Sequence, residues 1–234
     1  MREIVFDTET TGLDPFDGHR IVEIGCIELL NHIPTGLTFH RYLNPERDVP
    51  PEAFKVHGLS AEFLADKPRF EEIADELLTF FGDAHLIAHN ASFDFSFLSA
   101  EFDRIKRIGP TNERLIDTIA LARRKHSAGP YSLDALCLRY GIDNSRRTKH
   151  GALLDAEILA EVYLELIGAR QAQLGLGESG ISIANGTNGR GAIRVRPAPL
   201  PARITEAERL AHQSFIATLG EAALWRRYLP GESG

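Results

Sequence analysis

Along residues 1–168, the apolar positions change repeatedly between the spacing of strands and the spacing of helices. Short β-rich runs predict strands at 4–6, 21–30, 37–43 and 85–89, with turn residues at 31–36. Apolar residues three and four apart predict helices over 70–81, 92–107, 119–126, 132–140 and 152–167. Because three strands in hairpin order precede alternating helices and strands, the pattern indicates an α/β fold in which helices flank a mixed β-sheet.

The pattern ends near residue 170, and the chain beyond it differs in composition. Residues 175–201 are dominated by Gly, Ser, Asn and Pro, which is typical of a flexible linker. A capping box of Thr205 and Glu208 then predicts a short helical tail that also holds Trp225. About 30 residues cannot bury such apolar side chains alone, so we expect the tail to fold against a partner or to dock onto its own domain. The predicted divisions are a domain over 1–170, a linker over 171–201 and a tail over 202–234.

Composition narrows the class of protein. Of the 234 residues, 43% are hydrophobic and 25% are charged, which is ordinary for a soluble globular protein. No run approaches the roughly 18 apolar residues of a transmembrane helix, and the first strand begins too early for a signal peptide. We therefore expect a cytoplasmic protein.

Charge and cysteine content exclude further classes. The net charge of −7, from 26 basic and 33 acidic residues, disfavours a protein that coats a duplex through its phosphates. It is compatible with an enzyme that holds a few nucleotides through bound cations, because such ions invert the local electrostatics. Cys26 and Cys137 are too few for a disulfide framework or a zinc site.

Two acids follow the first strand. Asp7 and Glu9 lie two residues apart, so strand alternation directs both carboxylates to the same face. Carboxylates buried side by side raise each other's pKa unless a cation lies between them, and such hard oxygen ligands suit Mg²⁺ or Mn²⁺. Taken alone, the pair is equally compatible with a solvated strand end.

Two further segments place acids near the starts of helices. Asp94 lies among apolar residues and needs a partner or a metal there, unless it is simply a first-turn acid stabilised by the helix dipole. Asn90 and Ser92 are candidates to cap that helix. His150 precedes the last domain helix, whose first turns carry Asp155, and a histidine on this loop can act as a general base for water or merely cap the helix.

Together these segments form an ordered set: DTETTG at 7–12, HNASFDFSFL at 89–98 and HGALLD at 150–155. The set resembles the motifs of the DEDDh family of 3′–5′ exonucleases. The resemblance continues through PEAFKVHGLS at 51–60, through SLDALCLRYGIDNSRRTKHGALLDAEILAEVYL at 132–164, and into ALWRR at 223–227. Each motif alone is weak evidence, whereas the ordered trio is specific. Within the family, the chain is similar to the proofreading subunits of bacterial replicative polymerases.

The resemblance implies a ribonuclease H-like fold and phosphodiester hydrolysis with two divalent metal ions, Mg²⁺ or Mn²⁺. The positions that match the family's metal-binding acids are Asp7, Glu9, Asp94 and Asp155. His150 matches the base that takes a proton from the attacking water, a step for which it must be neutral. The positions that match substrate contacts are Asp7, Glu9, Thr10, Gly12, Leu13, Glu52, His57, Asn90 and Asp155.

The resemblance also implies the substrate and the partners. The substrate would be a single-stranded or frayed DNA 3′ end, and the cost of unpairing would supply the selectivity for mismatches. The tail would attach to the polymerase subunit with Trp225 as its anchor. Gln171, Leu174 and Leu176 have the spacing of a sliding-clamp-binding peptide, and an ordinary linker explains them equally well.

Two rival functions remain open at this point. An exoribonuclease can carry the same motifs, but it would not need the linker and the Trp225 tail. A nucleic-acid-binding adaptor could keep the fold without catalysis, but the presence of all four acids and His150 argues against that loss.

Overall fold

The computed structural model describes residues 1–147, 149–169 and 204–219, and the chain divides into two compact units, 1–175 and 176–234. In the described part of the first unit, five strands form one sheet in the order β3-β2-β1-β4-β5. The strands are β1 (Arg2–Thr10), β2 (Ile21–Leu30), β3 (Ile33–Tyr42), β4 (His85–Ala88) and β5 (Leu115–Asp117). The β1–β2 and β2–β3 pairs are antiparallel, whereas β4 runs parallel to β1 and β5 parallel to β4. The predicted mixed sheet is confirmed.

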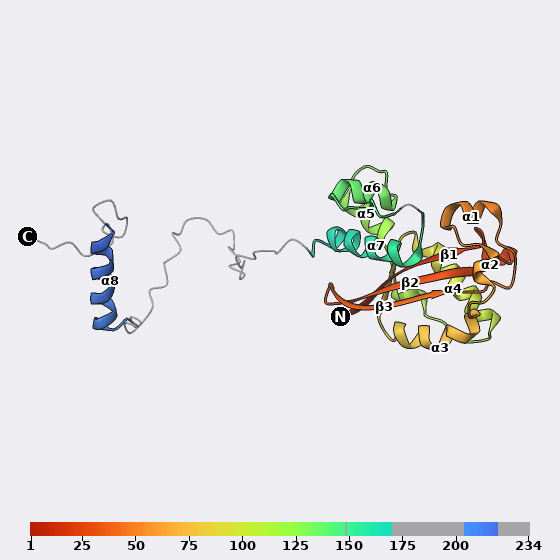
Figure 1. The fold of residues 1–234 in the computed structure, drawn as a ribbon, viewed down its shortest axis with the longest axis horizontal. Coiled ribbons are helices and arrows are strands. Elements are labelled where there is room, and N and C mark those ends of the chain that lie inside the picture. Colours follow the sequence, from red (N-terminus) through yellow and green to blue (C-terminus); the bar gives the residue numbers. More distant parts are fainter. Residues whose placement is uncertain (148, 170–203, 220–234) are drawn as a thin grey trace, which may run out of the picture. The chain divides into compact units, whose positions relative to one another are not determined.

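Helices cover both faces of this sheet (Figure 1). One face packs against α3 (Phe70–Phe81) and α4 (Ala91–Arg104). The other packs against α5 (Thr118–Lys125), α6 (Leu133–Tyr140) and α7 (Ala152–Ile167). Short helices occupy the connections: η1 (Pro15–Asp17), α1 (Pro51–His57), α2 (Ala61–Leu64) and η2 (Asn112–Arg114). The second unit contributes α8 (Glu206–Thr218), whose capping box of Thr205 and Glu208 is present as predicted.

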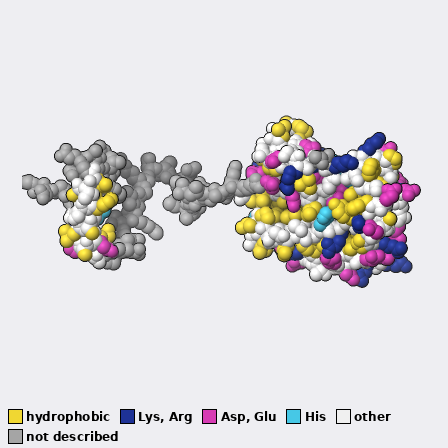
Figure 2. Space-filling model, viewed as in Figure 1, with side chains coloured by type: hydrophobic (Ala, Val, Ile, Leu, Met, Phe, Trp, Pro, Cys, Tyr) yellow, Lys and Arg dark blue, Asp and Glu magenta, His cyan; other side chains and the backbone are white. Residues whose placement is uncertain are grey.

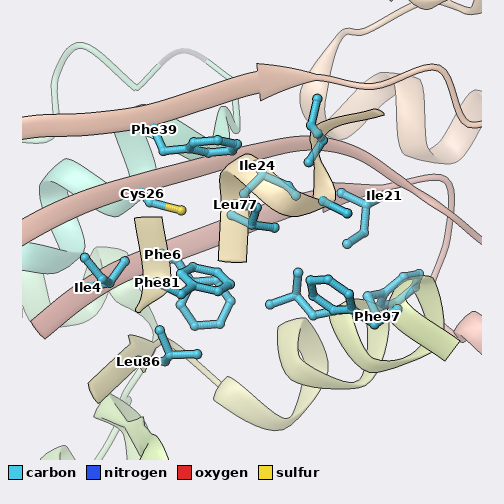
Figure 3. Close-up of a cluster of buried hydrophobic side chains, with 14 of the residues drawn as sticks. Ile4, Phe6, Ile21, Ile24, Cys26, Phe39, Leu77, Phe81, Leu86 and Phe97 are labelled. Atoms are coloured by element: carbon cyan, nitrogen blue, oxygen red, sulfur yellow. The ribbon is translucent and has the colours of Figure 1, made fainter. Parts of the chain in front are cut away.

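Side-chain alternation along β1 separates two hydrophobic cores. Ile4 and Phe6 are fully buried on the face of α3 and α4, where the rings of Phe6 and Phe81 meet edge to face at 6.0 Å (Figure 3). Val5 belongs to the opposite core, which α7 helps to form. Because alternate strand residues share a face, Asp7 and Glu9 project to the side of Val5 and α7.

Four details differ from the sequence predictions. β3 begins at Ile33 because Asn31 and His32, both with positive φ, complete the turn in two residues. Pro34 and Gly36, which the sequence pattern places in the turn, lie in this strand. Because β3 is an edge strand of the sheet, a proline is tolerated in it. Helices α1 and α2 were not predicted, and α4 ends at Arg104 instead of 107.

Other predictions concern features outside the sheet. The candidate partner residues Gln171, Leu174, Leu176 and Trp225 lie outside the described residues. Among the described residues, no helix is long and apolar enough to cross a membrane. Cys26 and Cys137 are buried free thiols in the two different cores.

Gly25 lets α7 approach the sheet closely. It pairs with Asp7 across the β1–β2 ladder. A Cβ at this position would lie 2.2 Å from the Leu153 nitrogen and 2.3 Å from the Ala152 carbonyl carbon, far inside van der Waals contact. The first turn of α7, which carries Asp155, therefore rests on β2 beside Asp7.

We predict that Gly25→Ala destabilises the chain, because the added methyl group forces the start of α7 away from β2. The expected loss is about 1–3 kcal/mol in the free energy of unfolding, measured by urea denaturation. Gly151→Ala is the matched control, since Gly151 lies at the same helix start in extended backbone and a Cβ there meets nothing within 4 Å. Equal stability of the two variants would contradict the close approach.

Candidate active site

The first two acids lie at the carboxyl end of β1. Glu9 is buried and Asp7 is half-buried, and both line a cavity at this end of the sheet. The alternation that buries Val5 against α7 gives Asp7 and Glu9 the same direction. The prediction that one face carries both carboxylates agrees with this arrangement.

Asp94 comes from a neighbouring element. Because β4 is parallel to β1, its carboxyl end lies at the same edge of the sheet, and α4 begins three residues beyond it. The Asp94 carboxylate is 3% exposed and accepts hydrogen bonds from the Thr8 amide (3.0 Å) and the Thr8 hydroxyl (2.6 Å). The prediction that Asn90 caps this helix by its side chain is wrong. Asn90 has a φ of 63° and turns the chain into α4 without a capping hydrogen bond.

The last two predicted residues come from the start of α7. Asp155 lies in the first turn and is 2% exposed, whereas His150 lies on the preceding loop with a side chain that is 48% exposed. Their Nδ1 and Oδ2 atoms are 3.2 Å apart. Ligand atoms of Glu9, His150 and Asp155 all lie within 4.8 Å of one another. The three sequence segments thus converge at one site.

Burial and mutual repulsion dominate the electrostatics of this site. Burial, followed by the charges of Asp94, Glu9 and Asp155, raises the pKa of Asp7 well above its usual value. Burial and the charge of Asp155 raise the pKa of Glu9 to about 8, and burial raises the pKa of Asp94 to about 7 despite the hydrogen bonds from Thr8. Carboxyl groups in such positions are fully ionised near neutral pH only with cations nearby.

One cation is supplied by the chain itself. The guanidinium of Arg147 donates to both oxygens of Asp155, from Nε at 2.6 Å and from Nη2 at 2.8 Å. Its Nη2 also lies 2.7 Å from His150 Nδ1, and its Nη1 lies 2.8 Å from Asp134 Oδ1. Burial alone would lower the pKa of Arg147, but the hydrogen bond and charge of Asp155 raise it. The sequence analysis missed this contact, for which the only signal was two arginines close before His150.

The cavity beside the acids is large enough for a small ligand. Its volume is about 580 Å³, within the usual range for ligand pockets. Of the predicted substrate-binding residues, those that line it are Asp7, Glu9, Thr10, Gly12, Leu13, Glu52 and His57. Leu13 is 85% exposed at its rim. Asn90 is exposed and is not a lining residue, and Asp155 lies behind the cavity against Arg147.

The imidazole of His57 lines this cavity. Its Nδ1 accepts a hydrogen bond from the Leu59 amide at 3.0 Å, so the ring proton of the neutral imidazole lies on Nε2. Nε2 is buried and makes no hydrogen bond of standard geometry among the described residues, although the backbone of Thr10 lies close enough to raise the pKa of His57. Burial has the larger effect and lowers the pKa of His57, which favours the neutral form. A buried donor with only a weak partner suits an acceptor atom on a bound ligand.

A buried charge cluster supports the loop over residues 11–20, part of which lines the cavity. Glu101 is fully buried. Its carboxylate accepts two hydrogen bonds from Arg20, at 2.7 and 2.9 Å, and one from Arg104 at 3.2 Å. Arg104 in turn donates to the carbonyl oxygens of Pro15 (3.0 Å) and His19 (3.3 Å). This network fixes the loop that carries Gly12 and Leu13. Sequence reasoning missed it, because the residues that meet are about 80 positions apart.

Comparison with known proteins identifies the family to which the chain is similar. The Exonuclease family model RNase_T matches residues 4–163. The DNA polymerase III subunit epsilon of Rickettsia felis is 46% identical over 226 residues, which cover 95% of this chain and 99% of that protein. The protein of the same name from Escherichia coli K12 is 52% identical over 176 residues, or 72% of each chain.

Solved structures agree on the fold. Exonuclease X in complex with 5′ overhanging duplex DNA is 25% identical, with a TM-score of 0.56 over 71% of this chain and 91% of its own. The nuclease domain of 3′hExo, described as a DEDDh family member bound to rAMP, has a TM-score of 0.63 at 16% identity over 72% of this chain and 92% of its own. With a family model over most of its length and relatives at 46–52% identity, this chain belongs to the DNA polymerase III epsilon-subunit family and contains that family's exonuclease domain.

Proposed function

We propose that this chain is the proofreading subunit of a replicative DNA polymerase III, a 3′–5′ exonuclease that removes mispaired nucleotides from DNA 3′ ends. The observation that carries the proposal is the convergence of four acids and His150 beside one cavity. These residues come from three segments spread over about 150 positions of the chain, and a chance cluster of this composition is improbable. Family membership supports the same activity.

The donor set fits divalent metal ions. Asp7, Glu9, Asp94 and Asp155 offer hard oxygen ligands, and the raised pKa values of the first three indicate carboxylates that lack compensating charge. We infer that these four residues hold two ions, Mg²⁺ or Mn²⁺. Bound there, the ions would supply Lewis-acid stabilisation of the attacking and leaving oxygens of an in-line displacement.

The remaining chemistry belongs to side chains. We assign His150 as the general base, since its exposed position on the loop before α7 allows it to reach a water molecule at the site. It must be neutral and must have a free ring nitrogen to accept the proton. Asp155 Oδ2 lies 3.2 Å from His150 Nδ1 and would orient the ring once Nδ1 carries the ring proton, which leaves Nε2 to act as the base.

The cavity would bind the terminal nucleotide. We propose that Glu52 and the Nε2–H of His57 contact the sugar, and that Thr10, Gly12 and Leu13 hold the base. Leu13 protrudes at the rim, where it can separate the terminal base from its neighbour. Asn90 and Asp155 complete the proposed set from outside the cavity lining. A mispaired end frays at lower cost, so no base readout is needed for selectivity.

The second unit supports attachment to the polymerase. Leu210 and Phe215 on α8, and Leu219 directly after it, are each about half exposed, which leaves apolar surface for a partner. We propose that the tail over 202–234, including Trp225, binds the alpha subunit of polymerase III. The linker over 171–201 would connect it to the exonuclease domain over 1–170. The segment with Gln171, Leu174 and Leu176 would bind the sliding clamp, and this association would place the chain in the cytoplasm.

The nuclease reaction distinguishes the proposal from its two rivals. With Mn²⁺ or Mg²⁺, we expect the full chain to shorten single-stranded DNA stepwise from the 3′ end. Asp7→Asn should slow this at least about 10³-fold, because loss of a ligand to the ions costs several kcal/mol of transition-state stabilisation. Asp103→Asn, an exposed acid on α4, is the control and should be unchanged. A strong preference for RNA would favour the exoribonuclease, and no cleavage of either substrate would favour an adaptor.

Metal affinity should depend on pH. Without metal, the raised pKa values of Asp7, Glu9 and Asp94 mean that the site retains protons near neutral pH. A divalent cation must displace them, so affinity for Mn²⁺ should rise at least about tenfold between about pH 6 and pH 8. Titration calorimetry in buffers of different ionisation enthalpy should detect the released protons. A pH-independent affinity without proton release would show that these carboxyl groups are already ionised.

A further inference from the structure

Arg147 lies among the acids of the proposed active site, although the proposed mechanism gives this side chain no role. Its side chain is only 11% exposed, and it lies within the acid cluster instead of at its rim. Both Asp155 oxygens accept hydrogen bonds from it at 2.6 and 2.8 Å. Such bidentate, charge-assisted pairs are among the stronger polar contacts in proteins. The guanidinium therefore competes with a metal ion for the two carboxylate oxygens of Asp155.

The same guanidinium also blocks the proposed base. A guanidinium has only donors, so His150 Nδ1 must be the acceptor of the 2.7 Å contact with Arg147 Nη2. In a neutral imidazole the proton then lies on Nε2. The only lone pair that could take a proton from water is thus already in use. In this arrangement His150 cannot act as a base.

We propose that Arg147 is an intramolecular counter-ion that occupies the acid cluster before metal ions bind and must leave Asp155 and His150 for the site to become active. The inference rests on the metal site of the proposed function. In the metal-free chain, Arg147 compensates part of the charge of the acids, and its guanidinium lowers the pKa of both Asp7 and Glu9 against the effect of burial. Bound metal ions make this compensation unnecessary.

The structure also offers a place for the released side chain. Asp134, on α6, accepts a hydrogen bond from Arg147 Nη1 at 2.8 Å, and its side chain is 62% exposed. Asn144 donates to the same Asp134 oxygen at 2.9 Å and ties the loop to α6. Arg147 can therefore release Asp155 while it keeps its contact with Asp134.

The most direct test observes Arg147 in the unmodified full chain. In chelator, the ¹⁵N–¹H signal of its Nε should have the shift of a group hydrogen-bonded to a carboxylate and should exchange slowly with water. Saturating Mg²⁺ should move the signal towards that of an exposed arginine. Comparison with the spectrum of Arg147→Gln identifies the signal. If Mg²⁺ binds and the signal does not change, the inference is overturned while the metal site stands. If neither Mg²⁺ nor Mn²⁺ binds, the proposed metal site itself fails.

A matched pair of variants tests the competition. Arg147→Gln should bind Mn²⁺ several-fold tighter, about tenfold if the released state is about 10% populated, because the competing cation is gone. It should also melt at a lower temperature in chelator. Arg146→Gln is the control, since Arg146 lies on the same loop with a side chain that is 69% exposed. If Arg147 only held Asp155 in place, Arg147→Gln would bind Mn²⁺ more weakly, and that result would overturn the inference.

Discussion

Four carboxylates share one edge of a β-sheet, and their mutual repulsion is the constraint on which the rest of the structure depends. Glu9, Asp94 and Asp155 are buried, and Asp7 is half-buried and lines the cavity together with Glu9 and Asp94. Isolated ionised groups in such surroundings cost far more free energy than a small domain can supply. The site is stable because protons, hydrogen bonds or cations compensate the charge of the carboxylates. The metal-free chain would use protons, Thr8 and Arg147, and the metal-bound chain would use the metal ions.

Much of the surrounding architecture can be explained by this need. Thr8 gives Asp94 two hydrogen-bond donors, and Gly25 leaves room for α7 to bring Asp155 next to β1. Arg147 supplies a positive charge from the chain. On the visible face of the described part of the larger unit, basic and acidic side chains are interspersed and no broad basic patch is seen (Figure 2). Local cations at the site, and not a broad basic surface, would then attract the phosphate backbone.

The sequence predicted the sheet and most helices because those features are local, whereas the convergence of the four acids was expected from the resemblance to the exonuclease motifs. Asp7 and Glu9 share a face by spacing alone, and the 152–167 helix has an unbroken apolar stripe. Parts that depend on tertiary contacts were not predicted. The pairing of Glu101 with Arg20 joins residues 81 positions apart, and no spacing rule detects it. The turn at Asn31 and the backbone of Asn90 depend on positive φ angles that the residue type permits but does not require.

A crystal structure of the full chain with Mn²⁺ and a deoxynucleoside 5′-monophosphate tests the account most directly. We predict anomalous density for metal ions among Asp7, Glu9, Asp94 and Asp155, a nucleotide in the adjoining cavity within reach of His57, and Arg147 in contact with Asp134 but not with Asp155. Metal density elsewhere, or a nucleotide outside the cavity, would contradict the proposed active site. The inference that metal ions replace Arg147 would be contradicted by a structure in which metal ions are bound to the acids and Arg147 still donates both hydrogen bonds to Asp155.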